Sequence, residues 1–443
     1  MATEPIRRVR EQSHETALDL DIRAMLRHLA ALPPSIDAPY VTVALDWQPD
    51  GGDPGRAATP EIRPSERRST RPEPGPSRRP SRQLMERELE VLLADHGPRG
   101  AAFDSLSADA ERIATYLDEE LDPSAQGVFI VACDALGVFE PLALGLPVPT
   151  RVAVGPAPAL SALAWLDDDH PTYAVLLADQ HEATLSLITQ ATLDQSVALD
   201  SSEYPRKQQQ GGWSQRRFQA RADERVAAFA RGIAEETRQA LDEAEVGMLI
   251  VAGDEVITSA LDPAFHQTVT DRIVGVLRLD IGATQEEIVA AAMPLVAQAE
   301  RDRETEAVAA LEDGLGGDGA AAVGPDDTLT ALQAGQAATL VLVDDFSGQG
   351  WADYALPLHG VGDVPAEHPA GGDPSQIVPV ALEDELIRLA ISTGAEVQIV
   401  HSTSPIRAVD LDEIPDAGSA QRRAAPAAAL DAMGGVGALL RYA

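Results

Sequence analysis

The chain has 443 residues, of which 44% are hydrophobic, and its formal net charge at pH 7 is -37. This length suffices for about three domains, each with a core of its own. An acidic surface commonly serves to keep a protein soluble. This net charge also excludes a protein that binds nucleic acid over its whole surface, so any contact with RNA must be local.

Cysteine usage and the N-terminus bear on the compartment. The one cysteine, Cys133, lies in the apolar run GVFIVACD and cannot form an intramolecular disulfide. We therefore expect a buried core residue and a reducing cytoplasm. The N-terminal sequence has no apolar signal segment, and no window approaches the roughly 18 to 20 apolar residues of a membrane span. No membrane contact is expected.

Several enzyme classes lose their usual signatures. Lys207 is the only lysine and is followed by Gln208, so the GK[ST] element of a P-loop is absent. The nine histidines form no HExxH motif, and neither CxxC nor GxSxG occurs. We expect no nucleotide hydrolysis of the P-loop type, no metal and no cofactor.

The first predicted domain covers residues 1–165. Apolar patterning predicts a helix over 20–32 and a strand over 40–47. Residues 48–82 are rich in Pro, Gly, Ser and Arg and are expected to be a disordered insertion. Its arginines near Arg78 could contact RNA, although a solvated insertion is the favoured interpretation. Further predicted elements are helices over 83–96 and 107–121 and strands over 127–134 and 150–155.

The second predicted domain covers residues 166–311. Two apolar runs separated by DQHE predict a hairpin over 171–189. A long helix follows the glycine loop, and its apolar residues recur at spacings of four and three: Phe218, Ala222, Val226, Phe229 and Ile233. Two strands (246–254 and 274–280) and a helix (283–311) complete what we predict to be a central mixed α/β sandwich.

The third predicted domain covers residues 312–443 and begins with a glycine-rich break. Strands are predicted over 339–346 and 396–402, and a helix over 384–393. The final GVGALLRYA is predicted to be a closing edge strand. The fold class is therefore α/β with three domains, and the central one has a glycine loop feeding a long helix.

One segment departs from the acidic background: RKQQQGGWSQRRFQARADERV, residues 206–226. Gly211 and Gly212 allow the backbone to approach a ligand closely, and Ser214 is suited to cap the helix that follows. That helix end is partially positive and is surrounded by basic residues, namely Arg206, Lys207, Arg216, Arg217, Arg221 and Arg225. The pattern favours a polyanion as ligand, although an inert flexible crossover would also explain it.

The same segment resembles the Gly-Gly-Gln loop of class-1 translation termination factors of eukaryotes and archaea. The matching positions are Gly211, Gly212, Ser214, Arg217, Phe218, Arg221 and Glu224. The order of domains is similar to that of the same factors and of Pelota. In that family the loop enters the peptidyl-transferase centre, and its glutamine places a water against the ester of peptidyl-tRNA.

Trp213 stands where that family has glutamine. Gln215, two residues later, gives a Gly-Gly-x-x-Gln arrangement that resembles the Vms/ANKZF peptidyl-tRNA hydrolases. Related hibernation factors of the Balon type have no catalytic loop. The ending GVGALLRYA is similar to actinobacterial relatives of the group. The lysine-containing decoding motif is missing, so stop-codon reading is not expected.

The resemblance implies a ribosome-rescue factor that hydrolyses peptidyl-tRNA or cleaves the CCA end of the tRNA. Gly211, Gly212 and Gln215 would be catalytic. RNA binding would fall to Arg206, Lys207, Trp213, Arg216, Arg217 and Arg221. The implied partners are the ribosomal A site and peptidyl-transferase centre, peptidyl-tRNA and a delivering GTPase, with neither DNA nor membrane. Two alternatives stay open: a non-catalytic hibernation factor in the A site, and an acidic scaffold without a ribosomal role.

Overall fold

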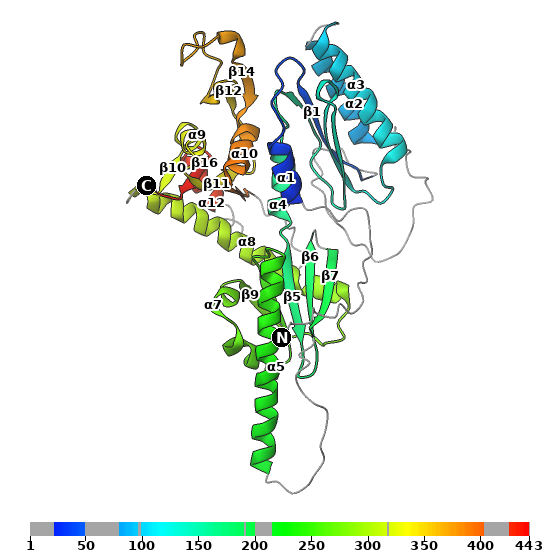
Figure 1. The fold of residues 1–443 in the computed structure, drawn as a ribbon, viewed down its shortest axis with the longest axis vertical. Helices are drawn as coiled ribbons and strands as arrows, with labels where there is room; N and C mark the ends of the chain where they lie inside the picture. Colours follow the sequence, from blue (N-terminus) through cyan, green and yellow to red (C-terminus); the bar gives the residue numbers. More distant parts are fainter. Residues whose placement is uncertain are drawn as a thin grey trace, which may run out of the picture. The chain divides into compact units, whose positions relative to one another are not determined.

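The computed structural model describes residues 22–48, 79–95, 99–189, 192–199, 215–316, 319–402 and 425–442. Of these, His170–Asp302 form one compact unit, here called the central unit. The described residues of Thr16–Asp169 and Arg303–Ala443 form the other, here called the flanking unit. The strands fall into the three predicted segments, with β1 to β4 in the first, β5 to β9 in the second and β10 to β16 in the third (Figure 1).

The N-terminal part of the flanking unit is an antiparallel sheet in the order β3-β2-β1-β4. Successive residues of β1 face opposite sides, so Val41 and Val43 pack with Met85 of α2, whereas Tyr40 packs with Leu29 of α1. Its elements are α1 (Ile22–Ala30), β1 (Tyr40–Asp46), α2 (Pro80–Asp95), α3 (Ala101–Thr115), a π-helical turn (Tyr116–Glu120), β2 (Gly127–Cys133), a 3-10 turn (Asp134–Leu136), β3 (Val138–Leu144), β4 (Arg151–Gly155) and α4 (Ser161–Asp169).

The predicted insertion over 48–82 is wrong at its C-terminal end. Helix α2 already begins at Pro80, and both Ser81 and Arg82 are buried. Proline suits the first turn of a helix because its missing N–H would have no partner there. Arg82 becomes tolerable in the interior because it donates to Glu86 at 2.9 Å. Residues 49–78 lie outside the described part of the chain.

Asp109 of α3 is a buried acid that gives stability a pH dependence. It is 2% exposed, and its Oδ2 has no hydrogen-bond partner among the described residues. Burial raises its pKa from 3.8 to about 7, against a backbone hydrogen bond from Asp134 that lowers it. The folded state therefore binds the proton of Asp109 more tightly than the unfolded state does. The stabilisation that this proton gives is complete below pH 3.8 and is lost as pH rises towards 7.

We expect Asp109→Asn to stabilise the protein at pH 8 by about 2 to 4 kcal/mol relative to wild type and to have little effect at pH 4. Urea unfolding at the two pH values measures the difference. Asp104→Asn, on an exposed position of the same helix, serves as the control. Equal effects of the Asp109 substitution at both pH values would contradict the expectation.

The central unit is a five-stranded sheet in the order β7-β6-β5-β8-β9 with helices on both faces. Ala174 and Leu176 of β5 pack against Ile233 of α5 on one face, and Val175 packs with Ala292 of α8 on the other. The predicted α/β class and central sandwich are confirmed. The elements are β5 (Tyr173–Ala178), β6 (Ala183–Thr189), β7 (Thr192–Leu199), α5 (Gln215–Glu243), β8 (Leu249–Gly253), α6 (Glu255–Leu261), a 3-10 turn (Asp262–Ala264), α7 (Gln267–Thr270), β9 (Ile273–Leu277) and α8 (Gln285–Gly316), which continues into the flanking unit.

The C-terminal part of the flanking unit has two sheets, ordered β10-β16-β11-β15 and β13-β12-β14. The predicted closing edge strand is wrong, because β16 lies between β10 and β11. Val436 and Ala438 are fully buried, which fits an interior strand. The elements are β10 (Ala321–Val323), α9 (Pro325–Gln333), β11 (Ala337–Val343), β12 (Gln349–Asp353), β13 (Leu358–Val361), a 3-10 turn (Pro374–Gln376), β14 (Val378–Ala381), α10 (Leu382–Thr393), β15 (Glu396–Val400), α12 (Ala425–Ala432) and β16 (Val436–Leu440).

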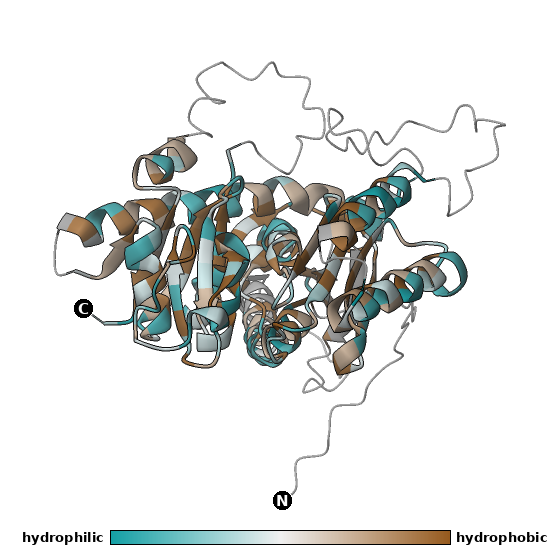
Figure 2. Ribbon diagram, turned by 90° about the horizontal axis from the view of Figure 1, so that it is seen from above, coloured by the Kyte–Doolittle hydropathy of each residue, from teal (hydrophilic) through white to brown (hydrophobic). Residues whose placement is uncertain are grey.

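Hydropathy follows this layering within each unit. The strands are coloured mainly as hydrophobic, and the helices carry both colours, as expected of helices with one face on a sheet (Figure 2).

Cys133 is fully buried at the end of β2, as predicted. Among the described residues, no helix combines the length and the apolar character that crossing a bilayer requires. The domain boundaries at 165 and 311 stay a prediction.

Candidate functional site

The predicted site belongs to the crossover between β7 and α5 of the central unit. Strand β7 pairs antiparallel with β6 at one edge of the sheet, and α5 begins at Gln215. The residues between them, which include Arg206, Lys207, Gly211, Gly212 and Trp213, lie outside the described residues. The expectation that Arg206 to Trp213 form an exposed loop therefore stays a prediction.

The structure describes the backbone of Gln215 but not its side chain. It is the first residue of α5, so it stands in the first turn of the helix as predicted. Backbone N–H groups in that turn have no partner within the helix and give this end a partial positive charge. The backbone is helical at Arg216, Arg217 and Arg221 as well, although the side chains of residues 215–223 lie outside the described set.

Helix α5 is anchored through its C-terminal half. Ala230 and Ile233 are fully buried, and Val226 and Phe229 pack against the same core, as their spacing predicted. At a rise of 1.5 Å per residue, the helix starts about 17 Å before Val226. Figure 1 shows this N-terminal part of α5 extending beyond the strands of the central sheet. The helix can therefore be held by one end while its other end reaches a ligand.

The charged residues of α5 are also distributed differently between its projecting N-terminal end and its anchored half. Residues 215–225 contain four arginines and two carboxylates, whereas residues 226–243 contain two arginines and four carboxylates. Arg225 and Glu224 are both exposed. The cationic character of this helix is thus concentrated at the end that faces away from its anchor.

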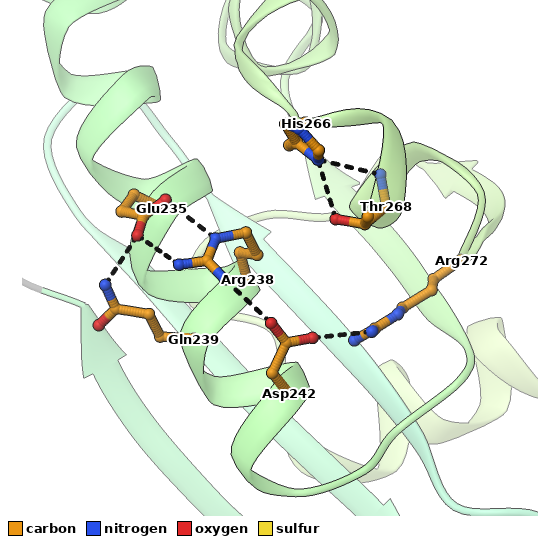
Figure 3. Close-up of polar contacts among 7 residues, drawn as sticks. All are labelled: Glu235, Arg238, Gln239, Asp242, His266, Thr268 and Arg272. Atoms are coloured by element: carbon orange, nitrogen blue, oxygen red, sulfur yellow. Dashed lines mark hydrogen bonds and ion pairs between the residues drawn. The ribbon is translucent and has the colours of Figure 1, made fainter.

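Arg238 of the anchored half is neutralised by neighbouring acids (Figure 3). Arg238 contacts Glu235 at 2.7 Å and Asp242 at 3.0 Å, and Arg272, which follows α7, contacts Asp242 at 2.7 Å. Hydrogen bonds from Arg238 and Gln239 lower the pKa of Glu235 to about 2. These contacts tie α5 to the segment between α7 and β9, and they leave little positive charge on Arg238 and Arg272 for an external anion.

Residues 158–297 match the model of bacterial archaeo-eukaryotic release factor family 10. This range, here called the release-factor segment, contains β5 to β9, all of α5 and the predicted loop. The predicted similarity to archaeo-eukaryotic release factors is thereby confirmed for this part of the chain. The narrower links to Vms/ANKZF and Balon-type proteins stay predictions.

No curated protein matches the sequence. Among solved structures, an archaeal translation termination factor, aRF1, is 14% identical, with 95% of this chain and 97% of that chain covered, at a TM-score of 0.21. Pelota of Archaeoglobus fulgidus is 16% identical, with 73% and 82% covered, at 0.26. Dom34 of S. cerevisiae is 12% identical, with 71% and 79% covered, at 0.35. Scores this low do not show a shared overall arrangement, so the similarity to release factors rests on the family match over residues 158–297.

The flanking unit has polar clusters that sequence reasoning missed. In one, Asp353 contacts His368 at 2.8 Å, and both side chains are nearly fully buried. In another, the carboxylates of Asp169 and Glu304 lie beside His401. Burial alone would lower the pKa of His401, but these two carboxylates outweigh it and raise that pKa to about 10. Asp353 and His368 are 15 residues apart, and Asp169, Glu304 and His401 come from three distant segments, so no short motif marks either cluster.

Proposed function

We propose that the chain is a ribosome-rescue factor whose release-factor segment hydrolyses peptidyl-tRNA on stalled ribosomes without reading a stop codon. The observation that carries this proposal is the placement of the Gly-Gly-x-x-Gln sequence. Its glutamine, Gln215, is the first residue of a long helix anchored at its opposite end, inside the segment that matches a release-factor family.

In this proposal Gly211 and Gly212 let the backbone approach the ester, and Gln215 orients the attacking water or the tRNA ribose. A neutral amide can both donate and accept hydrogen bonds, which suits it to hold a water without titrating. Placement of the water and its exclusion from bulk solvent supply most of the acceleration. Arg206, Lys207, Trp213, Arg216, Arg217 and Arg221 would contact RNA, and a translational GTPase would deliver the protein.

Trp213 favours a second candidate function. An indole offers one donor and no acceptor, so it cannot replace the glutamine that termination factors have at this position. A protein whose loop only fills the peptidyl-transferase centre would tolerate it. The alternative is therefore a non-catalytic hibernation factor that occupies the A site.

Release from stalled complexes separates these functions. Ribosomes carrying a labelled nascent chain on peptidyl-tRNA are incubated with the wild-type protein, and both co-sedimentation and free peptide are measured. Binding with release supports the hydrolase, whereas cleavage within the tRNA is read from the size of the labelled product. Binding without either product favours the hibernation factor. Absence of binding contradicts both and leaves the acidic scaffold.

Salt dependence tests which arginines contact RNA. Replacing Arg216 and Arg217 together by glutamine is expected to weaken ribosome binding and to reduce the slope of log Kd against log salt by about one to two. The matched control is the double variant Arg238→Gln/Arg272→Gln, which removes the same charge from arginines already paired with carboxylates. Equal slopes for wild type and the Arg216/Arg217 variant would place the RNA contacts elsewhere, with the arginines near Arg78 as the next candidates.

A further inference from the structure

A histidine and three carboxylates meet in the flanking unit. Asp168 and Asp169 are the last two residues of α4, Glu304 lies on α8, and His401 follows β15. One ligand atom each of Asp168, Asp169 and His401 lies within 4.8 Å of the others. This is the set of donor atoms, one imidazole nitrogen and two carboxylate oxygens, that suits a divalent first-row transition ion.

Glu304 orients the imidazole. Its Oε1 lies 3.0 Å from Nδ1 of His401, and its Oε2 accepts the backbone N–H of His401 at 3.4 Å. A carboxylate on one ring nitrogen is the usual outer partner of a metal-binding histidine, because it fixes the ring and leaves the other nitrogen for the ion. Here that other nitrogen, Nε2, lies 2.6 Å from Oδ1 of Asp169.

Asp169 contacts the imidazole nitrogen of His401 that Glu304 leaves open. Its Oδ1 is buried and lies 2.6 Å from Nε2 of His401, a distance at which the imidazole and the carboxylate share a proton. A divalent ion bound between these two atoms would take the place of the shared proton and keep both partners.

The surroundings also favour a cation. Asp168 and Asp169 end α4, and the carbonyl groups at the C-terminal end of a helix carry partial negative charge. Asp168 is held in place because its Oδ2 accepts the backbone N–H of Ile399 at 3.0 Å. The elements that carry the ligands are thus packed together independently of any ion.

We propose that Asp168, Asp169 and His401 bind one divalent first-row transition ion, with Glu304 as the positioning residue of the imidazole. Coordination requires the neutral ring, so the ion replaces the proton on Nε2. This site is independent of the proposed peptidyl-tRNA hydrolysis.

Asp169 and Glu304 lie next to the two points in the sequence where the chain passes between the flanking unit and the central unit. Asp169 is the last residue of the flanking unit before the chain enters the central unit, and Glu304 is the second residue after it returns. An ion held by Asp169 and His401, with Glu304 on the ring, would fix both of these segments to the end of β15. The expected role is therefore structural, within the flanking unit.

The experiment measures Zn²⁺ binding to the full chain by isothermal titration calorimetry, after chelator treatment and in 0.3 M NaCl to suppress weak binding by surface acids. Co²⁺ absorption reports the ligand geometry. The variants Asp169→Asn and His401→Gln remove one ligand each, and Glu304→Gln tests the positioning residue. The matched control is His368→Gln, which alters another buried histidine–carboxylate pair of the same unit, one with no third ligand among the residues that the structure describes. Circular dichroism confirms that each variant is folded.

We expect one Zn²⁺ per chain for wild type and for His368→Gln. Asp169→Asn and His401→Gln should lose this binding, and Glu304→Gln should weaken it by about 10- to 100-fold. The same Zn²⁺ affinity in wild type, Asp169→Asn and His401→Gln would overturn the proposal, as would no binding to wild type. His401 would then be an imidazolium held between two carboxylates.

Discussion

Gln215→Ala is expected to lower the rate of peptide release from ribosome-bound peptidyl-tRNA by about 10² to 10³-fold and to leave ribosome binding unchanged. The loss of one positioned hydrogen-bonding group typically has an effect of this size. Gln215 is placed in the first turn of α5, where the partial positive charge of the helix end would stabilise charge that develops on the ester oxygen. Single-turnover release from stalled complexes measures the rate.

Trp213→Ala is the matched variant within the same loop. If the indole stacks on a nucleotide, its removal should weaken binding by roughly 1 to 3 kcal/mol and leave the rate of release from saturated complexes largely intact. The two substitutions therefore act on different measurements. Release that is unaffected by Gln215→Ala would show that this amide is not the catalytic group, and tight binding without release by the wild type would favour the hibernation factor.

Glu385→Ala is expected to destabilise the flanking unit by about 3 to 5 kcal/mol, because it leaves buried partners without their countercharge. Oε1 of Glu385 lies 2.5 Å from Arg388 and 2.9 Å from His359, and the hydroxyl of Tyr354 donates to Oε2 at 3.1 Å. Burial would raise the pKa of Glu385, but hydrogen bonds from His359 and Arg388 outweigh it and lower that pKa to about 2.

The pH dependence of this effect has a definite sign. Because the pKa in the folded state is depressed, the stabilisation from Glu385 is present above its ordinary pKa of 4.5 and is lost as pH falls towards 2. Urea unfolding at pH 7 compares wild type with Glu385→Ala and with Glu396→Ala, an exposed glutamate of the same unit. The control should change the free energy of unfolding by less than about 0.5 kcal/mol. A similarly small effect of Glu385→Ala would show that this network contributes little to stability.

Local patterning was enough to predict the α/β class and most long elements. Apolar runs became largely buried strands in β1, β2, β5, β8 and β11, and the spacing of Val226, Phe229 and Ile233 identified the packed face of α5. Strands β12 and β14 were missed because Gln349–Asp353 has polar ends and Val378–Ala381 contains a proline. Such short segments become strands only through their partners.

The sequence by itself determined the position of the Gly-Gly-x-x-Gln motif, its arginines and its continuation into a helix, because these are local properties of consecutive residues. Only the tertiary structure decided that β16 lies inside its sheet, that Arg238 and Arg272 share Asp242, and that His401 meets Asp169 and Glu304. Those contacts join segments distant in the sequence. They depend on strand order and helix packing, which hydrophobic periodicity along one segment does not encode.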